Sequence, residues 1–171
     1  MDFLDDMIGQ WAGEDTGLDA DTLNIVTRIR RLSTYLEKRT DHALAPLGLT
    51  LWQLEVLAAL QPAPDGLLVH ELLPAALLSP AAMTHRLDRL ESAGWIERLP
   101  SPSDRRATRI RLTPAGRQLT LRALTVHNVQ SAQSLAPLSP AQAHELLQTL
   151  RLLLHHLCQS ECAKNLRPSE D

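Results

Sequence analysis

The sequence predicts a mainly α-helical protein with one small β-hairpin. Leucine and alanine are abundant, and aromatic residues make up only 3% of the 171 residues, a composition that favours helices over strands. Apolar residues recur at helical spacing through most of the chain. Only two short segments, 95–99 and 108–113, alternate apolar and polar residues as strands do.

Composition and charge limit the kind of protein. No apolar run reaches the roughly eighteen residues of a transmembrane helix, and the N-terminus MDFLDDMIGQW lacks the basic region of a secretory signal. We therefore expect a cytoplasmic protein without a membrane partner. The formal net charge is −3, yet residues 86–117 hold eight arginines and only four acidic residues. This local excess of positive charge indicates a nucleic-acid partner.

The N-terminal half is expected to begin with a helix from about residue 21 to 45. Its apolar residues share one face: Leu23, Val26, Ile29, Leu32 and Leu36. Gly48 suits the left-handed turn that ends a helix. Thr50 begins the next helix as its N-cap, and Gln53 completes a capping box. That helix ends at the sequence QPAPDG.

Two further helices are expected before the hairpin. The first covers residues 67–78 and is interrupted around Pro74. The second covers residues 80–93, with Ser79 as N-cap, Pro80 at the first helical position and Gly94 after its end. Its predicted buried stripe is Met83, Leu87 and Leu90. Its other side carries Thr84, His85, Arg86, Asp88 and Arg89.

After the hairpin the sequence predicts two long helices. One runs from Thr113-Pro114 to about residue 134, and the other from a second capping box, Ser139–Gln142, to about residue 162. The leucines of the last helix cover more than one packed face: Leu146, Leu147, Leu150, Leu152, Leu153, Leu154 and Leu157. A helix that is apolar on several sides is buried on several sides, so we expect a second subunit.

Three helices followed by a hairpin predict a winged helix-turn-helix, that is, a mainly α fold with a small β-hairpin wing. Helix 80–93 then enters the major groove of DNA, and hairpin 95–112 lies against the neighbouring backbone or minor groove. Arginine suits this role because its planar guanidinium binds phosphate oxygens and fits a narrow minor groove. The predicted DNA-binding residues are Ser79, Thr84, His85, Arg89, Arg105, Arg106 and Arg109.

One stretch carries a resemblance to a known family. The segments LTLWQLEVLAAL and SPAAMTHRLDRLESAGWIERLPSPSDRRATRIRLTPAGRQL resemble the core of the MarR family of bacterial winged-helix regulators. The motif DRR followed by I-x-LTxxG is the most specific part, and the resemblance covers residues 20–160. It implies an obligate homodimer, joined by the first helix and the last two. It also implies a repressor of a pseudo-palindromic double-stranded DNA operator, released by a small ligand or an oxidant.

The same resemblance implies a division of the chain. Residues 1–20 form an extra N-terminal helix segment, residues 21–48 and 113–162 the helical dimerisation region, residues 49–112 the winged helix-turn-helix lobe that binds DNA, and residues 163–171 a C-terminal tail.

A closer resemblance is to the urate-responsive and PecS-like subgroup, carried by IGQW and by AMTxRLDRLE followed by IERLP. It implies a ligand pocket formed by Trp11, Glu55, Arg86 and Arg98. Glu replaces the usual Asp at 55, and His85 replaces the asparagine usual before Arg86. Urate or a related purine, or another aromatic acid of the phenolic or benzoate type, fits such a pocket. Glu55 is then the expected partner of Arg86 without ligand. The simpler alternative is a plain ion pair, with Trp11 as a hydrophobic anchor.

Other functions are weighed against this one. Cys158 and Cys162 are four residues apart and share a helical face. They are either reduced thiols or the redox switch of a regulator with the same fold. No histidine or cysteine cluster has metal-ligand spacing, so we expect no metal and no cofactor. The absence of a nucleophile motif or phosphate-binding glycine loop argues against an enzyme. A winged helix that binds proteins and not DNA remains an alternative. Trp52 and Trp95 are expected to pack inside the lobe.

Overall fold

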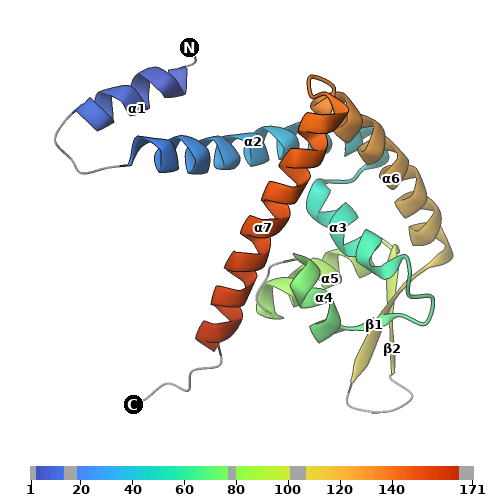
Figure 1. Ribbon diagram of the computed structural model, residues 1–171. Helices are drawn as coiled ribbons and strands as arrows, with labels where there is room; N and C mark the ends of the chain where they lie inside the picture. The colour runs from blue at the N-terminus through green and yellow to red at the C-terminus, as the bar shows by residue number, and fades with distance from the viewer. Residues whose placement is uncertain (1–2, 14–18, 77–79, 101–106, 166–171) are drawn as a thin grey trace, which may run out of the picture. The chain divides into compact units, whose positions relative to one another are not determined.

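The computed structural model describes residues 3–13, 19–76, 80–100 and 107–165. The chain forms two compact units, Met1–Ser131 and Ala132–Asp171. Within the described ranges the helices are α1 (Phe3–Gly13), α2 (Ala20–Leu44), α3 (Leu51–Leu60), α4 (Val69–Ala76), α5 (Pro80–Ser92), α6 (Pro114–Leu135) and α7 (Pro140–Asn165) (Figure 1). A short 3-10 helix, Ala45–Leu47, follows α2. The strands are β1 (Leu67–Leu68), β2 (Ile96–Pro100) and β3 (Thr108–Leu112). The predicted mainly α fold with a small hairpin is confirmed.

The sheet has one strand more than the sequence predicts. Its order is β1-β3-β2, with both neighbouring pairs antiparallel. Strand β1 has only two residues, too few for an alternating pattern to stand out in the sequence. Gly66 precedes it at φ 81°, and a Cβ there would lie 2.5 Å from the carbonyl oxygen of Ile110. Glycine therefore lets β1 approach β3 closely.

The predicted interruption at Pro74 is wrong. Helix α4 includes Pro74, and its described part continues to Ala76. Proline removes one backbone hydrogen bond from a helix and crowds the preceding turn. The buried Leu72, only 1% exposed, anchors the same helix in the core, and this packing offsets the local cost.

The predicted helix boundaries mostly hold. Gly48 and Gly94 adopt φ values of 69° and 75°, the left-handed conformation expected after a helix. The backbone N–H of Thr50 donates to Oε1 of Gln53 at 2.8 Å, as a capping box requires. The backbone N–H of Ser139 donates to Oε1 of Gln142 at 2.9 Å in the same way. Helix α7 extends to Asn165, beyond the predicted end at 162.

The lobe formed by α3, α4, α5 and the sheet has a closed apolar core. It contains Leu54, Leu57, Leu60, Leu72, Met83, Leu87, Leu90, Ile96, Ile110 and Leu112. Trp52 and Trp95 are partly buried and pack against this core, as predicted. The buried Ala123 of α6 belongs to the same cluster. The lobe is also joined to α2, because the side chain of Asp41 accepts a 2.6 Å hydrogen bond from the backbone N–H of Leu51.

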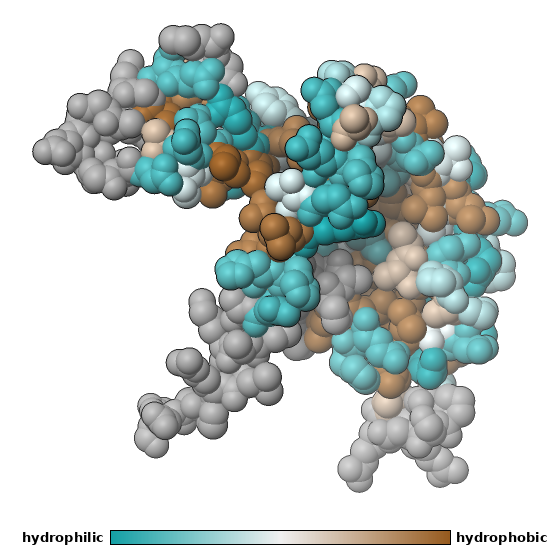
Figure 2. Space-filling model, viewed as in Figure 1, coloured by the Kyte–Doolittle hydropathy of each residue, from teal (hydrophilic) through white to brown (hydrophobic). Residues whose placement is uncertain are grey.

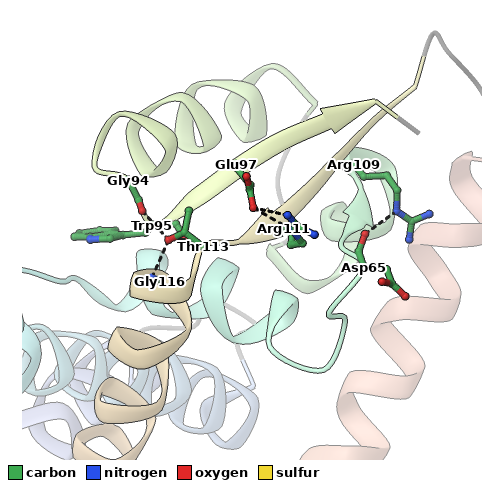
Figure 3. Close-up of polar contacts among 8 residues, drawn as sticks. All are labelled: Asp65, Gly94, Trp95, Glu97, Arg109, Arg111, Thr113 and Gly116. Atoms are coloured by element: carbon green, nitrogen blue, oxygen red, sulfur yellow. Dashed lines mark hydrogen bonds and ion pairs between the residues drawn. The ribbon is translucent and has the colours of Figure 1, made fainter. Parts of the chain in front are cut away.

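Thr113 joins the end of the sheet to the start of α6 (Figure 3). Its N–H donates to the carbonyl of Trp95 at 3.0 Å. Its hydroxyl donates to the carbonyl of Gly94 at 2.7 Å and accepts from the N–H of Gly116 at 3.0 Å. A Cβ on Gly116 would lie 1.9 Å from the carbonyl oxygen of Trp95. The sequence LTPAG thus combines an N-cap threonine with a glycine that allows close contact.

Near the N-terminus, α1 packs on α2. Leu4 and Ile8 are buried at 6% and 1% exposure. The carboxylate of Asp5 forms an ion pair with Arg28 at 2.5 Å, and the guanidinium of Arg31 lies 5.8 Å from the centre of the Phe3 ring. Both contacts join α1 to α2.

The long helices leave large apolar side chains in solvent. On α2 these are Ile25, Val26, Ile29, Leu32 and Tyr35, and Figure 2 shows apolar surface over this helix. On α6 they are Leu121, Val129 and Leu135, and on α7 Leu146, Leu147, Leu150, Leu152, Leu153, Leu154 and Leu157. Among the described helices, none alone is long and apolar enough to cross a membrane. Residues 20–47 and 51–60 reach that length and composition only when taken together across a 75° bend.

Candidate DNA-binding surface and ligand residues

Helix α5 turns one side into the core and the other into solvent. Met83, Leu87 and Leu90 are 0% exposed, which confirms the predicted buried stripe. Thr84, His85 and Arg89 are exposed on the outer side of the helix. The hairpin of β2 and β3 follows α5 directly along the chain (Figure 1). A polar helix face beside a hairpin is the arrangement that a winged helix-turn-helix presents to DNA.

Three of the predicted DNA-binding residues, Ser79, Arg105 and Arg106, lie outside the described residues. Arg109 of β3 is described, and its guanidinium binds within the protein. It donates to the carbonyl of Asp65 at 3.1 Å (Figure 3), and it also donates to the carbonyl of Gly66. Arg109 therefore ties β3 to the loop before β1, and its contact with DNA stays a prediction.

Arg98 of β2 is held by two acidic residues of α5. Its guanidinium forms an ion pair with Asp88 at 2.6 Å and another with Glu91. Burial acts to lower the pKa of Arg98, but the hydrogen bonds and charges of Asp88 and Glu91 raise that pKa above its usual value. The two ion pairs connect β2, the first strand of the wing, to α5.

Arg111 and Arg117 also bind acceptors within the protein. Arg111 and Glu97 face each other across β3 and β2, and their side chains form an ion pair at 2.7 Å (Figure 3). Arg117 of α6 donates to the carbonyl of Gln61 at 3.1 Å. These contacts brace the sheet and the start of α6.

Arg86 and Arg89 are held in a different way. Their guanidinium carbons lie 4.8 Å and 5.4 Å from the ring centre of Trp52 on α3. Among the described residues, neither guanidinium forms a hydrogen bond or an ion pair. This contact is not predictable from the sequence. Trp52 and the arginines are far apart in the chain, and no spacing rule connects them.

Glu55 and Arg86, two of the predicted ligand residues, are electrostatically coupled. Burial raises the pKa of Glu55, the charge of Arg86 lowers it, Glu37 raises it and His127 lowers it, with a net upward shift. No direct ion pair joins Glu55 to Arg86 within the described part of the chain, because the Arg86 guanidinium lies over Trp52. The expected ion pair between them is therefore absent from this structure.

The roles of the other two predicted ligand residues, Arg98 and Trp11, stay predictions. Arg98 is paired with Asp88 and Glu91. Trp11 belongs to α1, but its side chain lies outside the described part. His127 of α6, which carries no sequence signal of a ligand site, also acts on this region. Its Nδ1 is buried without a hydrogen-bond partner in the described structure, and its charge acts on Glu55.

No metal site or completed redox pair is described. Where the structure is described, no three His, Cys, Asp or Glu residues are grouped to hold a metal ion. Cys158 is an exposed thiol on α7. The side chain of Cys162 is outside the described part, so the redox alternative stays a prediction.

A helix with a solvent-facing polar side, followed directly by an antiparallel hairpin, defines a winged helix-turn-helix protein of the DNA-binding class. The model of the MarR family matches residues 47–107. The HTH-type transcriptional repressor Rv2887 of Mycobacterium tuberculosis is 37% identical over 123 residues, which cover 72% of this chain and 88% of the relative. The chain belongs to the MarR family and is a DNA-binding transcriptional regulator.

Other comparisons agree with this assignment. PecS of Dickeya dadantii is 29% identical over 156 residues, covering 90% of this chain and 94% of PecS. The solved Rv2887 complex with p-aminosalicylic acid has a TM-score of 0.59 at 36% identity, and covers 73% of this chain and 94% of that one. Escherichia coli MarR complexed with operator DNA shares the fold, with a TM-score of 0.72 at 24% identity over 90% of this chain and 99% of that one. The relatives are named as transcriptional regulators, which are not enzymes.

Proposed function

We propose that this regulator is a repressor that binds a pseudo-palindromic operator as a homodimer and that a small aromatic anion releases it. The observation that carries DNA binding is the orientation of α5, whose core stripe is 0% exposed while Thr84, His85 and Arg89 face solvent. Rv2887, named a transcriptional repressor, supports the direction of regulation.

The exposed apolar faces of α2, α6 and α7 support the homodimer. Monomeric proteins rarely expose large apolar patches. Each of the three helices leaves large apolar side chains exposed: isoleucine, valine, leucine and tyrosine on α2, leucine and valine on α6, and leucine on α7. A second copy of the chain is the simplest partner that offers a matching surface. A two-fold symmetric dimer then presents two copies of α5, and the two half-sites of its operator lie about one helical turn of DNA apart.

In the proposed complex, Thr84, His85 and Arg89 meet base edges in the major groove. Arg105 and Arg106 bind the phosphate backbone or enter the minor groove. Ser79 directly precedes α5 in the sequence, and the backbone N–H groups at a helix N-terminus favour a phosphate. Arg109 contributes positive charge from the wing while its guanidinium keeps the wing strand in place.

The proposed ligand is a planar aromatic acid, with Trp11, Glu55, Arg86 and Arg98 as its binding residues. The Rv2887 structure holds p-aminosalicylic acid, which supports this chemical class, and urate or a related purine has the same planar anionic character. A carboxylate that drew Arg98 away from Asp88 and Glu91 would loosen the connection between β2 and α5. That loss gives a physical route from ligand binding to release from DNA.

The test of DNA binding uses a duplex selected from a random-sequence library with the full-length wild-type protein. Replacing Arg105 by alanine should weaken binding and lower the salt dependence by about one unit of slope for each lost phosphate contact. Arg122→Ala, on the exposed side of α6, is the charge-matched control and should leave the slope unchanged. If Arg105→Ala keeps both affinity and slope, the wing takes no part in binding.

The test of the ligand is a thermal-shift series with urate, salicylate and related aromatic acids. A compound that binds only the folded state raises the melting temperature and should also release the selected duplex. Tryptophan fluorescence then locates the site, with Trp11→Phe as the control because Trp52 and Trp95 also emit. An identical fluorescence response in Trp11→Phe would remove Trp11 from the pocket.

A further inference from the structure

The arginines of residues 86–117 that the structure describes fall into two groups. Arg98, Arg109, Arg111 and Arg117 donate hydrogen bonds to carboxylates or carbonyls of the protein. Arg86 and Arg89, both on α5, instead lie over the ring of Trp52. We propose that Trp52 is a positioning residue for DNA recognition, which orders the guanidinium groups of Arg86 and Arg89 before DNA arrives. This proposal rests on the proposed function and deepens it, because Arg86, proposed above as a ligand residue, serves DNA recognition when no ligand is bound.

Trp52 is a fixed support. It is partly buried and packs against the lobe core, so its indole has few alternative orientations. It lies in the first turn of α3. The hydrogen bonds of Thr50 with Gln53, and of Leu51 with Asp41, fix that turn. A ring anchored in this way gives the guanidinium groups of Arg86 and Arg89 a fixed surface to lie on.

The two distances are within the range of a cation–π interaction. The guanidinium carbons lie 4.8 Å and 5.4 Å from the ring centre of Trp52, and such contacts are favourable within about 6 Å. Arg86 and Arg89 are three residues apart on α5 and so lie on neighbouring parts of its surface, where like charges repel. The electron-rich indole attracts both guanidinium groups, and this attraction offsets part of that repulsion.

Stacking leaves the hydrogen-bonding groups of arginine available. The guanidinium carbon of each arginine lies over the Trp52 ring, and the ring takes up none of the N–H donors that point outward in the guanidinium plane. Within the described residues these donors have no protein acceptor on either arginine, and Arg89 is exposed to solvent. They can therefore bind phosphate or base oxygens without first breaking an ion pair, which Arg98 and Arg111 cannot do.

Order before binding favours affinity. A free arginine side chain loses conformational entropy when DNA fixes it, and this loss weakens binding. An arginine already stacked on Trp52 has lost most of that freedom in the free protein. Removing the aromatic ring should therefore weaken DNA binding even though Trp52 itself donates nothing to DNA.

The experiment distinguishes the effect of the aromatic ring of Trp52 from the effect of its packing in the core. Trp52→Phe keeps an aromatic face, and Trp52→Leu keeps apolar packing without one. The affinity of each variant for the selected duplex is measured by fluorescence anisotropy, beside melting temperature. We expect Trp52→Leu to weaken binding about tenfold and Trp52→Phe no more than about threefold. In an Arg86→Ala/Arg89→Ala background, Trp52→Leu should cause almost no further loss.

A second readout needs no DNA. In the wild type, ring current from Trp52 should shift the Nε–Hε resonances of Arg86 and Arg89, and Trp52→Leu should abolish those shifts. If Trp52→Leu is not folded at the measuring temperature, Trp52→Met replaces it as the apolar variant without a ring.

The outcomes distinguish this proposal from the proposed function. Equal losses of affinity in Trp52→Phe and Trp52→Leu, or a full loss that persists without the two arginines, show a packing role and overturn the positioning role. Unchanged affinity in Trp52→Leu overturns it as well, while leaving DNA binding intact. Failure of the wild type to select or bind any duplex overturns the proposed function, and the positioning role with it.

Discussion

The lobe and the long helices use the same residue, leucine, in opposite ways. In the lobe, Leu57 and Leu87 are 0% exposed, whereas Leu152 and Leu154 of α7 are 70% and 61% exposed. Full burial of a leucine side chain contributes about 1.5–3 kcal/mol. The lobe therefore gains its stability from contacts within one chain, while α7 leaves large apolar side chains exposed, which the proposed second subunit would bury. The stability of the lobe should not depend on protein concentration, and that of the long helices should.

The largest effect is expected where the lobe meets α6. Alanine in place of glycine usually stabilises a helix, by up to about 1 kcal/mol. Gly116→Ala should do the opposite, because its Cβ would lie 1.9 Å from the carbonyl oxygen of Trp95. Moving α6 away from that carbonyl disturbs the bonds of Thr113, and we expect a loss of about 2 kcal/mol in the free energy of unfolding. Urea denaturation followed by circular dichroism measures it.

The matched control for Gly116→Ala is Ala115→Ser. Ala115 is the preceding residue of α6 and is exposed, so one added atom meets no neighbour there. Its free energy of unfolding should stay within about 0.5 kcal/mol of the wild type. A stabilising Gly116→Ala would mean that α6 does not pack closely on Trp95, and that the lobe and this helix are only loosely joined.

The sequence predicted the lobe well because its signals are local. The capping box at Thr50, the glycine after α5, and the stripe of Met83, Leu87 and Leu90 are each read from a few adjacent residues. Their outcome depends little on the rest of the chain. The two-residue strand β1 and the continuous α4 were missed for the converse reason, since pairing with β3 and burial of Leu72 decide them.

The candidate site was harder to predict than the fold. The excess of arginine was visible in the sequence, but the partners of each arginine were not. Arg98 is held by Asp88 and Glu91, and Arg109 by the carbonyls of Asp65 and Gly66. Contacts between residues distant in sequence decide which arginines are available to DNA. The periodicity of the sequence carries no information about such contacts.

A smaller effect is expected from a charge placed on the long helices. Leu154→Asp should weaken self-association, because a carboxylate on an apolar interface must lose its water. We expect at least a tenfold rise in the dissociation constant of the dimer, measured by sedimentation equilibrium over a range of concentrations. Unfolding of the lobe, followed at a concentration where both proteins are monomeric, should change little.

Gln148→Asp on the exposed surface of α7 is the control for Leu154→Asp, since it adds the same charge to the same helix at a polar position. If both variants associate as the wild type does, the leucines of α7 do not form the contact between subunits. A wild type that remains monomeric at high concentration would leave the exposed leucines without the partner proposed for them.

The smallest effect concerns Glu55, at the border between the lobe and the long helices. Burial, opposed by Arg86 and aided by Glu37 of α2, raises the pKa of Glu55. A carboxyl group with a raised pKa binds its proton more tightly in the folded protein than in the unfolded chain. Its contribution to stability is therefore greatest at low pH and is lost as pH rises from the ordinary pKa through the folded value.

Glu55→Gln removes this titration. The difference in unfolding free energy between variant and wild type should shift in favour of the variant as pH rises from about 4 to 7, by no more than about 0.5 kcal/mol because Glu55 is largely exposed. Urea denaturation at several pH values measures it, with Glu145→Gln on the exposed surface of α7 as control. A shift in the opposite direction would mean that the attraction of Arg86 outweighs burial, and that Glu55 and Arg86 form the ion pair that this structure does not contain.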